Sequence, residues 1–168
     1  MRKRSTCFAL ALALGTTVLS AGVADATGPL SGTKIRSWQT GFVLGAASNS
    51  TVGGTVIQYQ TDTDQLAQKW AIDPVTTTTF LVHNLNSDMC MNVVGTGANG
   101  EIQQRPCDSR WDEQIFSLKD SSKPGRYSIK NDALGKCFQL ASTGANSGVY
   151  LHTCTPTNAY QVTSFDVR

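Results

Sequence analysis

The sequence repeats itself three times, and this constrains the fold more than any other feature. Ile35, Val82 and Ile129 lie 47 positions apart. Further matches at steps of 46 or 47 are Val43, Cys90 and Cys137; Val56, Ile102 and Val149; Thr61, Cys107 and Cys154; and Gln68, Gln114 and Gln161. A unit of this length cannot hide its own apolar face, so three such units are expected to share one core.

Each repeat contains four short segments typical of β-strands. They are rich in β-branched and aromatic residues and are separated by clusters of Gly, Asn, Asp, Ser and Thr. The expected strands are 34–38, 42–46, 56–59, 69–72, 80–84, 89–94, 102–104, 115–118, 127–130, 137–141, 149–152 and 164–167. No sustained apolar period of 3.6 residues appears after residue 26, so we expect no helix longer than a single turn.

The number and length of the repeats select the architecture. A solenoid would show shorter periods and more copies, and a propeller would need at least four blades. Three units of about 47 residues, near 33–74, 79–120 and 126–168, instead predict an all-β protein that closes into a small barrel with a hairpin cap.

Residues 1–26 have the pattern of a signal peptide. Arg2, Lys3 and Arg4 precede an apolar stretch over 7–23, and Ala24-Asp25-Ala26 offers small residues for cleavage. We therefore expect a secreted, extracellular protein that consists of a single domain over 27–168. A retained membrane-spanning helix is the weaker alternative, because Gly15-Thr16-Thr17 interrupts the apolar core.

The expected mature chain carries almost no net charge. Removal of residues 1–26 takes away three of the 14 basic residues and one of the 12 acidic ones, which leaves 11 of each. A neutral domain lacks the positive surface that phosphate backbones or anionic membranes attract. We therefore predict no nucleic-acid partner and no stable membrane anchor.

Four of the five cysteines remain after residue 26, an even number that suits an oxidising compartment. Four cysteines allow three pairings. Cys90 to Cys107 and Cys137 to Cys154 both span 17 positions, which favours these two disulfides within their repeats. Zinc held by four thiolates is the alternative, although the spacing is not the paired Cys-x-x-Cys of zinc sites.

Gln68-Lys69-Trp70 and Gln114-Ile115-Phe116 resemble the Gln-x-Trp signature of ricin-type β-trefoil lectins. Together with the cysteine pairs, the resemblance covers residues 33–168. It implies a β-trefoil in which the aromatic ring fills the barrel core and the Gln bonds to backbone. The third copy departs, because Thr163 follows Gln161 at the aromatic position; we expect Phe165 to be the displaced core aromatic, reached through a bulge or a shifted strand.

The resemblance also implies one shallow sugar pocket in each repeat. Such a pocket uses an Asp two residues after the first cysteine, an aromatic on the third strand and an Asn before the motif Gln. The Asp is absent from all three copies, where Gly45, Asn92 and Gln139 stand instead. The other positions of the first repeat hold Ile57, Tyr59 and Ala67, of which only Tyr59 could serve a sugar, so we expect that pocket to be inactive.

Polar candidates remain in the other two repeats. The second repeat offers Asn92, Gln103, Arg105 and Glu113, and the third offers Gln139, Tyr150, His152 and Tyr160. The Arg105 guanidinium would accept a carboxylate or sulfate on a glycan, unless Glu113 pairs with it. Trp111 would either cover the second pocket or act as an exposed contact residue.

The sequence gives no sign of a catalytic, metal or cofactor site. His83 and His152 lie in different repeats and at different strand positions, and no nucleophile elbow or phosphate-binding loop is present. Acidic residues of the segment 108–120 alternate with Arg and Lys, as on a solvated surface. We predict a lectin-like protein that binds a glycan or glycoconjugate without catalysis. The alternatives are a protein-interaction or toxin cell-binding subunit and, further away, a β-trefoil protease inhibitor.

Overall fold

The computed structural model describes residues 30–95 and 100–166; the expected signal peptide lies outside these ranges. This part of the chain forms twelve strands and four single-turn 3-10 helices, so the predicted all-β class is confirmed. The strands are β1 (Leu30–Ser37), β2 (Val43–Ala46), β3 (Ile57–Gln60), β4 (Trp70–Pro74), β5 (Thr79–Asn84), β6 (Met89–Val94), β7 (Glu101–Arg105), β8 (Phe116–Asp120), β9 (Tyr127–Asn131), β10 (Lys136–Leu140), β11 (Ser147–Thr153) and β12 (Thr163–Asp166). The 3-10 helices are η1 (Ala47–Asn49), η2 (Leu66–Gln68), η3 (Asp112–Gln114) and η4 (Ala159–Gln161).

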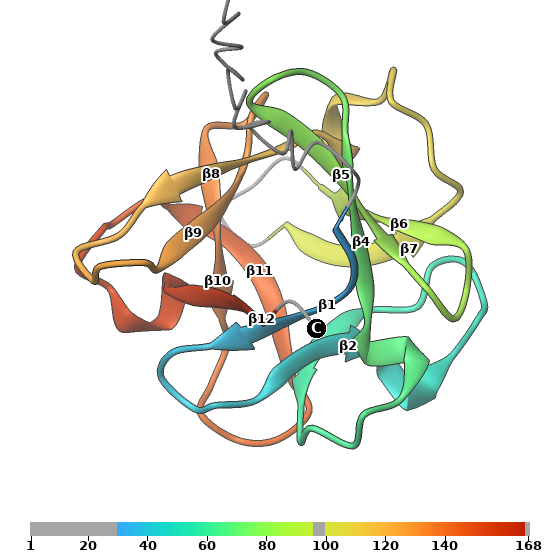
Figure 1. Ribbon diagram of the computed structural model, residues 1–168, viewed down its shortest axis with the longest axis horizontal. Helices are drawn as coiled ribbons and strands as arrows, with labels where there is room; N and C mark the ends of the chain where they lie inside the picture. Colours follow the sequence, from blue (N-terminus) through green and yellow to red (C-terminus); the bar gives the residue numbers. More distant parts are fainter. Residues whose placement is uncertain (1–29, 96–99, 167–168) are drawn as a thin grey trace, which may run out of the picture.

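The first and fourth strands of the three repeats close into a six-stranded barrel (Figure 1). Antiparallel pairing runs from β1 to β4, β5, β8, β9 and β12, and β12 pairs with β1 to complete the ring. Closure removes the unpaired strand edges that an open sheet would expose.

The second and third strands of each repeat form three hairpins that cap the barrel. They are β2–β3, β6–β7 and β10–β11. Strand β11 pairs with β3 and with β7, and a bridge between Val56 and Gln103 joins the remaining pair of hairpins. A six-stranded barrel capped by three hairpins is the β-trefoil that the threefold repeat predicted.

All three repeats contribute to one core. Side chains alternate along the strands, so that Phe80, Val82 and Asn84 of β5 are buried while Leu81 and His83 are partly exposed. Phe116 and Phe138, from the second and third repeats, meet edge to face with their ring centroids 5.2 Å apart. The apolar faces of the repeats therefore pack against one another, as the sequence repeat requires.

The third repeat closes without the expected bulge. Strand β12 keeps a continuous register with β1 from Thr163, opposite Ser37, to Asp166, opposite Lys34. Thr163 is buried and its hydroxyl donates to the carbonyl of Tyr127. Phe165 lies two residues farther along the same strand and packs only partly against the core.

The first hairpin turn of each repeat needs a left-handed residue. Gly41, Asp88 and Gly135 stand at equivalent positions with φ values of 74°, 58° and 63°. Glycine adopts this conformation without strain, whereas Asp accepts it at a modest cost.

Both predicted disulfides are confirmed. Cys90 bonds to Cys107 and Cys137 bonds to Cys154, each across 17 positions. In each hairpin the position of the first cysteine pairs with a residue of the third strand: Val43 with Gln60, Cys90 with Arg105 and Cys137 with His152. The second cysteine of each pair comes two residues after that partner, so the equivalent position in the first repeat is Asp62 and not Thr61.

Asp62 pairs with the buried Lys34 and the partly exposed Arg36 where the other repeats have a disulfide. Its carboxylate contacts Lys34 Nζ at 2.7 Å and Arg36 Nη2 at 2.8 Å, and Asp64 also contacts Lys34 Nζ, at 2.8 Å. The Lys34 side chain is only 2% exposed, and that of Asp62 is 26% exposed. Burial acts to raise the pKa of Asp62, but hydrogen bonds from Lys34 and Arg36 outweigh it and hold that pKa well below its usual range.

We expect Asp62→Asn to lower the free energy of unfolding by about 3 kcal/mol, because the buried Lys34 loses the less exposed of its two carboxylate partners and keeps Asp64. The matched control is Asp132→Asn, which breaks the more exposed pair with Lys130 at 3.0 Å and should cost less than about 1 kcal/mol. Urea denaturation of the two variants measures the difference, and equal losses would contradict a structural role for the Asp62 cluster.

The same cluster should make stability depend on acid pH. Since the pKa of Asp62 is lower in the folded chain than in the unfolded one, its contribution is complete above the unfolded-state value of about 4 and is lost as the pH falls through the folded value. The urea midpoint of the wild type should therefore fall more steeply below about pH 4 than that of Asp62→Asn. Parallel pH profiles would exclude Asp62 as the source.

Candidate functional site

The motif glutamines of the three repeats lie side by side with the predicted sugar positions. Gln68, Gln114 and Gln161 are at most 1% exposed. Each side-chain Oε1 accepts from a backbone N–H, that of Thr63, Asp108 or Thr155 respectively. Each Nε2 donates to a backbone carbonyl, that of Thr61, Pro106 or Thr153 respectively. The glutamines thus fasten the turn that follows the third strand.

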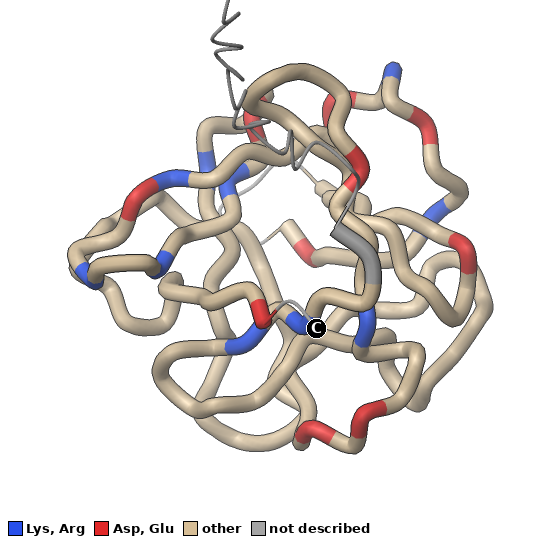
Figure 2. Tube along the Cα trace, in the orientation of Figure 1, with Lys and Arg blue, Asp and Glu red and all other residues tan. Residues whose placement is uncertain are grey.

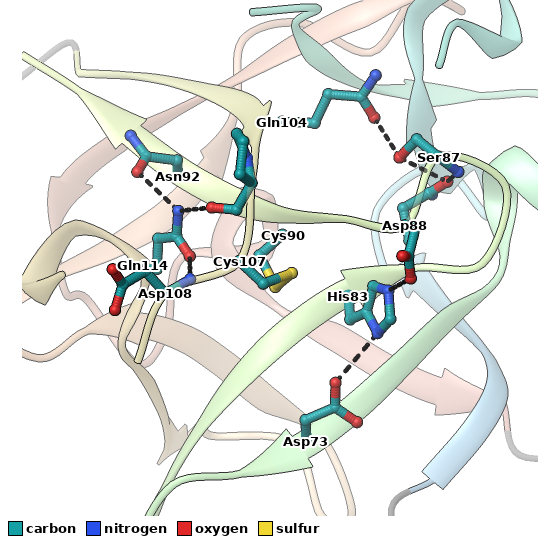
Figure 3. The surroundings of a disulfide bond; sticks show 12 residues. Asp73, His83, Ser87, Asp88, Cys90, Asn92, Gln104, Cys107, Asp108 and Gln114 are labelled. Atoms are coloured by element: carbon teal, nitrogen blue, oxygen red, sulfur yellow. Dashed lines mark hydrogen bonds and ion pairs between the residues drawn. A yellow bond between two sulfur atoms is a disulfide. The ribbon is translucent and has the colours of Figure 1, made fainter. Parts of the chain in front are cut away.

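In the second and third repeats, a third bond of the motif glutamine uses a residue expected to face the sugar. Gln114 Nε2 donates to Asn92 Oδ1 at 3.3 Å (Figure 3), and Gln161 Nε2 donates to Gln139 Oε1 at 3.0 Å. Asn92 also donates to the Val93 carbonyl and is only 8% exposed. Asn92 and Gln139 are therefore engaged within the fold, which leaves them little capacity to bind a ligand.

The first repeat reaches the same arrangement differently. Gly45 has no side chain, and Gln60 from the opposite strand accepts from Gln68 Nε2 at 3.3 Å. A Cβ atom at residue 45 would meet Gln60 Oε1 at 3.0 Å, so glycine leaves the room that Gln60 occupies. The motif glutamine has a side-chain partner in every repeat, although the partner comes from a different strand in the first.

The expectation that the first repeat offers only Tyr59 is wrong. Ile57 and Tyr59 are buried in the core, where burial raises the pKa of the Tyr59 hydroxyl well above its usual range. Gln58 and Gln60 hold the positions equivalent to Gln103 and Arg105. They line a cleft of about 390 Å³ whose walls also include Asn146 from the third repeat. From Val43 to its partner Gln60 the first hairpin spans 17 positions, two more than the corresponding 15 in the other two hairpins. A one-residue error of alignment exchanges the two faces of a strand.

The third-repeat candidates differ in their bonding and in their exposure. Gln139 Nε2 donates to the Tyr150 hydroxyl at 3.1 Å, and Gln139 Oε1 also accepts from Asn158 Nδ2 at 3.0 Å. His152 and Tyr160 are exposed. Gln139 and Tyr150 thus bond to each other, while the two exposed rings remain at the surface.

The second repeat forms a cleft of about 380 Å³. Three of the predicted residues line it, namely Asn92, Arg105 and Glu113. Gln103 does not line the cleft but holds Arg105, whose Nη2 donates to Gln103 Oε1 at 3.1 Å. No ion pair joins Arg105 to Glu113. The remaining walls are Val93, Val94, Gly95, Trp111, Asp112, Asn131, Ala133 and Leu134.

The loop that carries Trp111 is anchored at both ends. The Cys90–Cys107 disulfide holds its start and Gln114 holds its end (Figure 3). Between them, a bidentate pair with Arg110 lowers the pKa of Asp108 to about 2. Trp111 is 46% exposed at the wall of the cleft. Trp111 forms part of the wall of the second-repeat cleft, which agrees with its predicted role at the second pocket.

His83 belongs to a separate cluster. Its two ring nitrogens lie 3.2 Å from Asp73 Oδ2 and 2.7 Å from Asp88 Oδ1 (Figure 3). None of the three residues lines the second-repeat cleft. Within residues 30–95 and 100–166, no group of three His, Cys, Asp or Glu side chains is placed to hold a metal ion.

Two protein-family models match the sequence. One describes a ricin-type β-trefoil lectin domain-like family and matches residues 23–105; the other describes the ricin-type β-trefoil lectin domain and matches residues 78–167. The chain belongs to the ricin-type β-trefoil lectin family. The resemblance seen in the Gln-x-aromatic motifs is thereby confirmed. Membership of this lectin family supports carbohydrate binding as the general function.

Solved structures share the fold of this ricin-type trefoil at low sequence identity. The designed threefold-symmetric protein ThreeFoil superimposes with a TM-score of 0.74 at 17% identity, covering 81% of this chain and 97% of the designed one. An exo-β-1,3-galactanase from Clostridium thermocellum gives 0.75 at 19% identity over 82% of this chain and 30% of its own. A Polyporus squamosus lectin bound to a Neu5Aca2-6Galb1-4GlcNAc epitope gives 0.67 at 22% identity, over 82% and 49%. No curated protein sequence matches the chain.

The disulfides bear on where this ricin-type trefoil works. A disulfide-bonded lectin domain fits an extracellular protein. None of the helices among the described residues has the length and apolar character needed to cross a membrane. Basic and acidic residues are interspersed along the chain (Figure 2).

We expect Asn92→Ala to lower the free energy of unfolding by about 1–3 kcal/mol, because one N–H of the buried Gln114 amide loses its acceptor. Gln103→Ala is the control, since this partly exposed side chain on the neighbouring strand supports no motif glutamine, and it should cost less than about 0.5 kcal/mol. Thermal unfolding followed by circular dichroism measures both. A stable Asn92→Ala protein would show that the glutamine does not need this bond.

Proposed function

We propose that the protein is a secreted, non-catalytic carbohydrate-binding protein whose glycan site is the second-repeat cleft. The observation that carries the proposal is the composition of this cleft, in which an exposed indole and apolar side chains adjoin carboxylate, amide and guanidinium groups. Sugars present both a C–H face and hydroxyl groups, so a binding site needs apolar surface together with hydrogen-bonding groups. Membership of the ricin-type lectin family indicates a carbohydrate as the class of ligand.

The absence of catalysis is proposed from the environment of the acidic residues. A glycosidase needs two carboxyl groups on either side of the scissile bond, one of them kept protonated by an apolar environment. Asp112 and Glu113 line the cleft but are exposed to solvent, and the His83 cluster lies outside it. The cleft therefore favours binding over hydrolysis.

A glycan array tests the site with two matched substitutions. Ala133 is exposed in the wall of the second-repeat cleft, and Ala145 is exposed in the wall of the first-repeat cleft. Ala133→Trp should fill the second cleft and abolish glycan retention, whereas Ala145→Trp should leave retention unchanged. Both variants should melt close to the wild type, since each added ring begins at an exposed position.

Three outcomes would contradict the proposal. Wild-type protein that retains no glycan would remove the lectin function. Retention lost only in Ala145→Trp would move the site to the first repeat. Release of reducing ends from a bound oligosaccharide would show that the protein is an enzyme.

A further inference from the structure

We infer that the second-repeat cleft binds an uncharged pyranose through Trp111 and Glu113, two side chains of the loop between β7 and β8. This inference rests on the proposed glycan-binding function. In the family arrangement, the carboxylate comes from the second strand of a repeat and the stacking aromatic from the third. Here both groups would come from the loop before the motif glutamine, where Glu113 stands at the position of the family's Asn.

Strands β6 and β7 supply neither the carboxylate nor the stacking aromatic of the family arrangement. Asn92 stands at the carboxylate position, but its Oδ1 accepts from Gln114 and its Nδ2 donates to the Val93 carbonyl. Arg105 stands at the stacking position and is tied to Gln103. A site built from these strands alone would have neither a carboxylate nor an aromatic face.

Trp111 supplies the missing aromatic face. Its side chain is 46% exposed although it lines a cleft, so an indole surface is available to a ligand. Val93, Val94 and Leu134 add apolar surface in the same cleft. The C–H face of a pyranose can pack on such an aromatic surface, which removes apolar area from water.

Glu113 supplies the missing carboxylate. It is exposed in the wall of the cleft, and no ion pair between described residues includes either Glu113 or its neighbour Asp112. A free carboxylate has two oxygens that can accept from adjacent sugar hydroxyls, and such charge-assisted bonds are stronger than neutral ones. The glutamate therefore needs no rearrangement of a salt bridge before it binds a vicinal diol.

The charges of the cleft select the class of sugar. Two carboxylates, Asp112 and Glu113, face one guanidinium, that of Arg105. A uronic acid or sulfated sugar would bring a further negative charge close to both carboxylates, and like charges repel. Arg105 can still donate to a hydroxyl or ring oxygen of an uncharged sugar. Neutral glycans are therefore expected to bind better than acidic ones.

The test compares full-length mature protein with four variants on immobilised galactose, glucose, mannose and glucuronic acid. Trp111→Ala and Glu113→Gln should each weaken binding of a neutral sugar on the order of tenfold, the loss that corresponds to about 1.4 kcal/mol. Trp38→Ala and Glu101→Gln are the controls, because Trp38 is also exposed, at 48%, and Glu101 is an exposed carboxylate of β7, yet neither lines the cleft. The controls should bind as the wild type does.

Fluorescence gives an independent readout. The neutral sugar that binds should change the tryptophan emission of the wild type and of Trp38→Ala, but not that of Trp111→Ala. Neutral-sugar binding that persists unchanged in Trp111→Ala and Glu113→Gln would overturn the inference and leave the proposed function intact. Stronger retention on glucuronic acid would overturn the assigned class of sugar. A wild type that binds no glycan on this surface or on the array would overturn the proposed function itself.

Discussion

Three buried glutamine side chains hold this trefoil in register. In each repeat, the side chain of Gln68, Gln114 or Gln161 bonds to one backbone N–H and one backbone carbonyl of the turn after the third strand. A buried N–H or C=O group that lacks a hydrogen-bond partner destabilises the fold by the cost of its desolvation. The hairpin cap is thereby joined to the fourth strand, and in the first repeat the motif glutamine itself lines the neighbouring cleft.

The repeats differ mainly in what surrounds that junction. Disulfides brace it in the second and third repeats, whereas in the first repeat Asp62 stands at the position of the second cysteine and pairs with the buried Lys34. The partner of the glutamine also differs: Gln60, Asn92 or Gln139. Side chains that bond to the motif glutamine have fewer hydrogen-bonding groups left for a ligand. In the second repeat, the loop that carries Trp111 adds exposed side chains to the wall of the cleft.

The repeat spacing predicts the fold, both disulfides and the positions of the twelve strands, because these depend on sequence order and periodicity. The faces of β3 were predicted wrongly, although the alternation of Ile57 and Tyr59 with Gln58 and Gln60 was a visible signal of the buried side. The inward orientation of Asn92 and Gln139 has no such signal, since it depends on contacts with a glutamine more than twenty positions away. Trp111 was recognised as a residue of interest, but only the folded loop places it in the cleft wall.

Side-chain hydrogen exchange tests the central claim most directly. In protein labelled with nitrogen-15 at glutamine, nuclear magnetic resonance resolves the side-chain amide protons of each residue. We predict that Gln68, Gln114 and Gln161 exchange only when the whole domain unfolds, because their amides are buried and fully bonded, while the exposed Gln65 exchanges freely. Exchange of the three motif amides as fast as that of Gln65 would contradict the account.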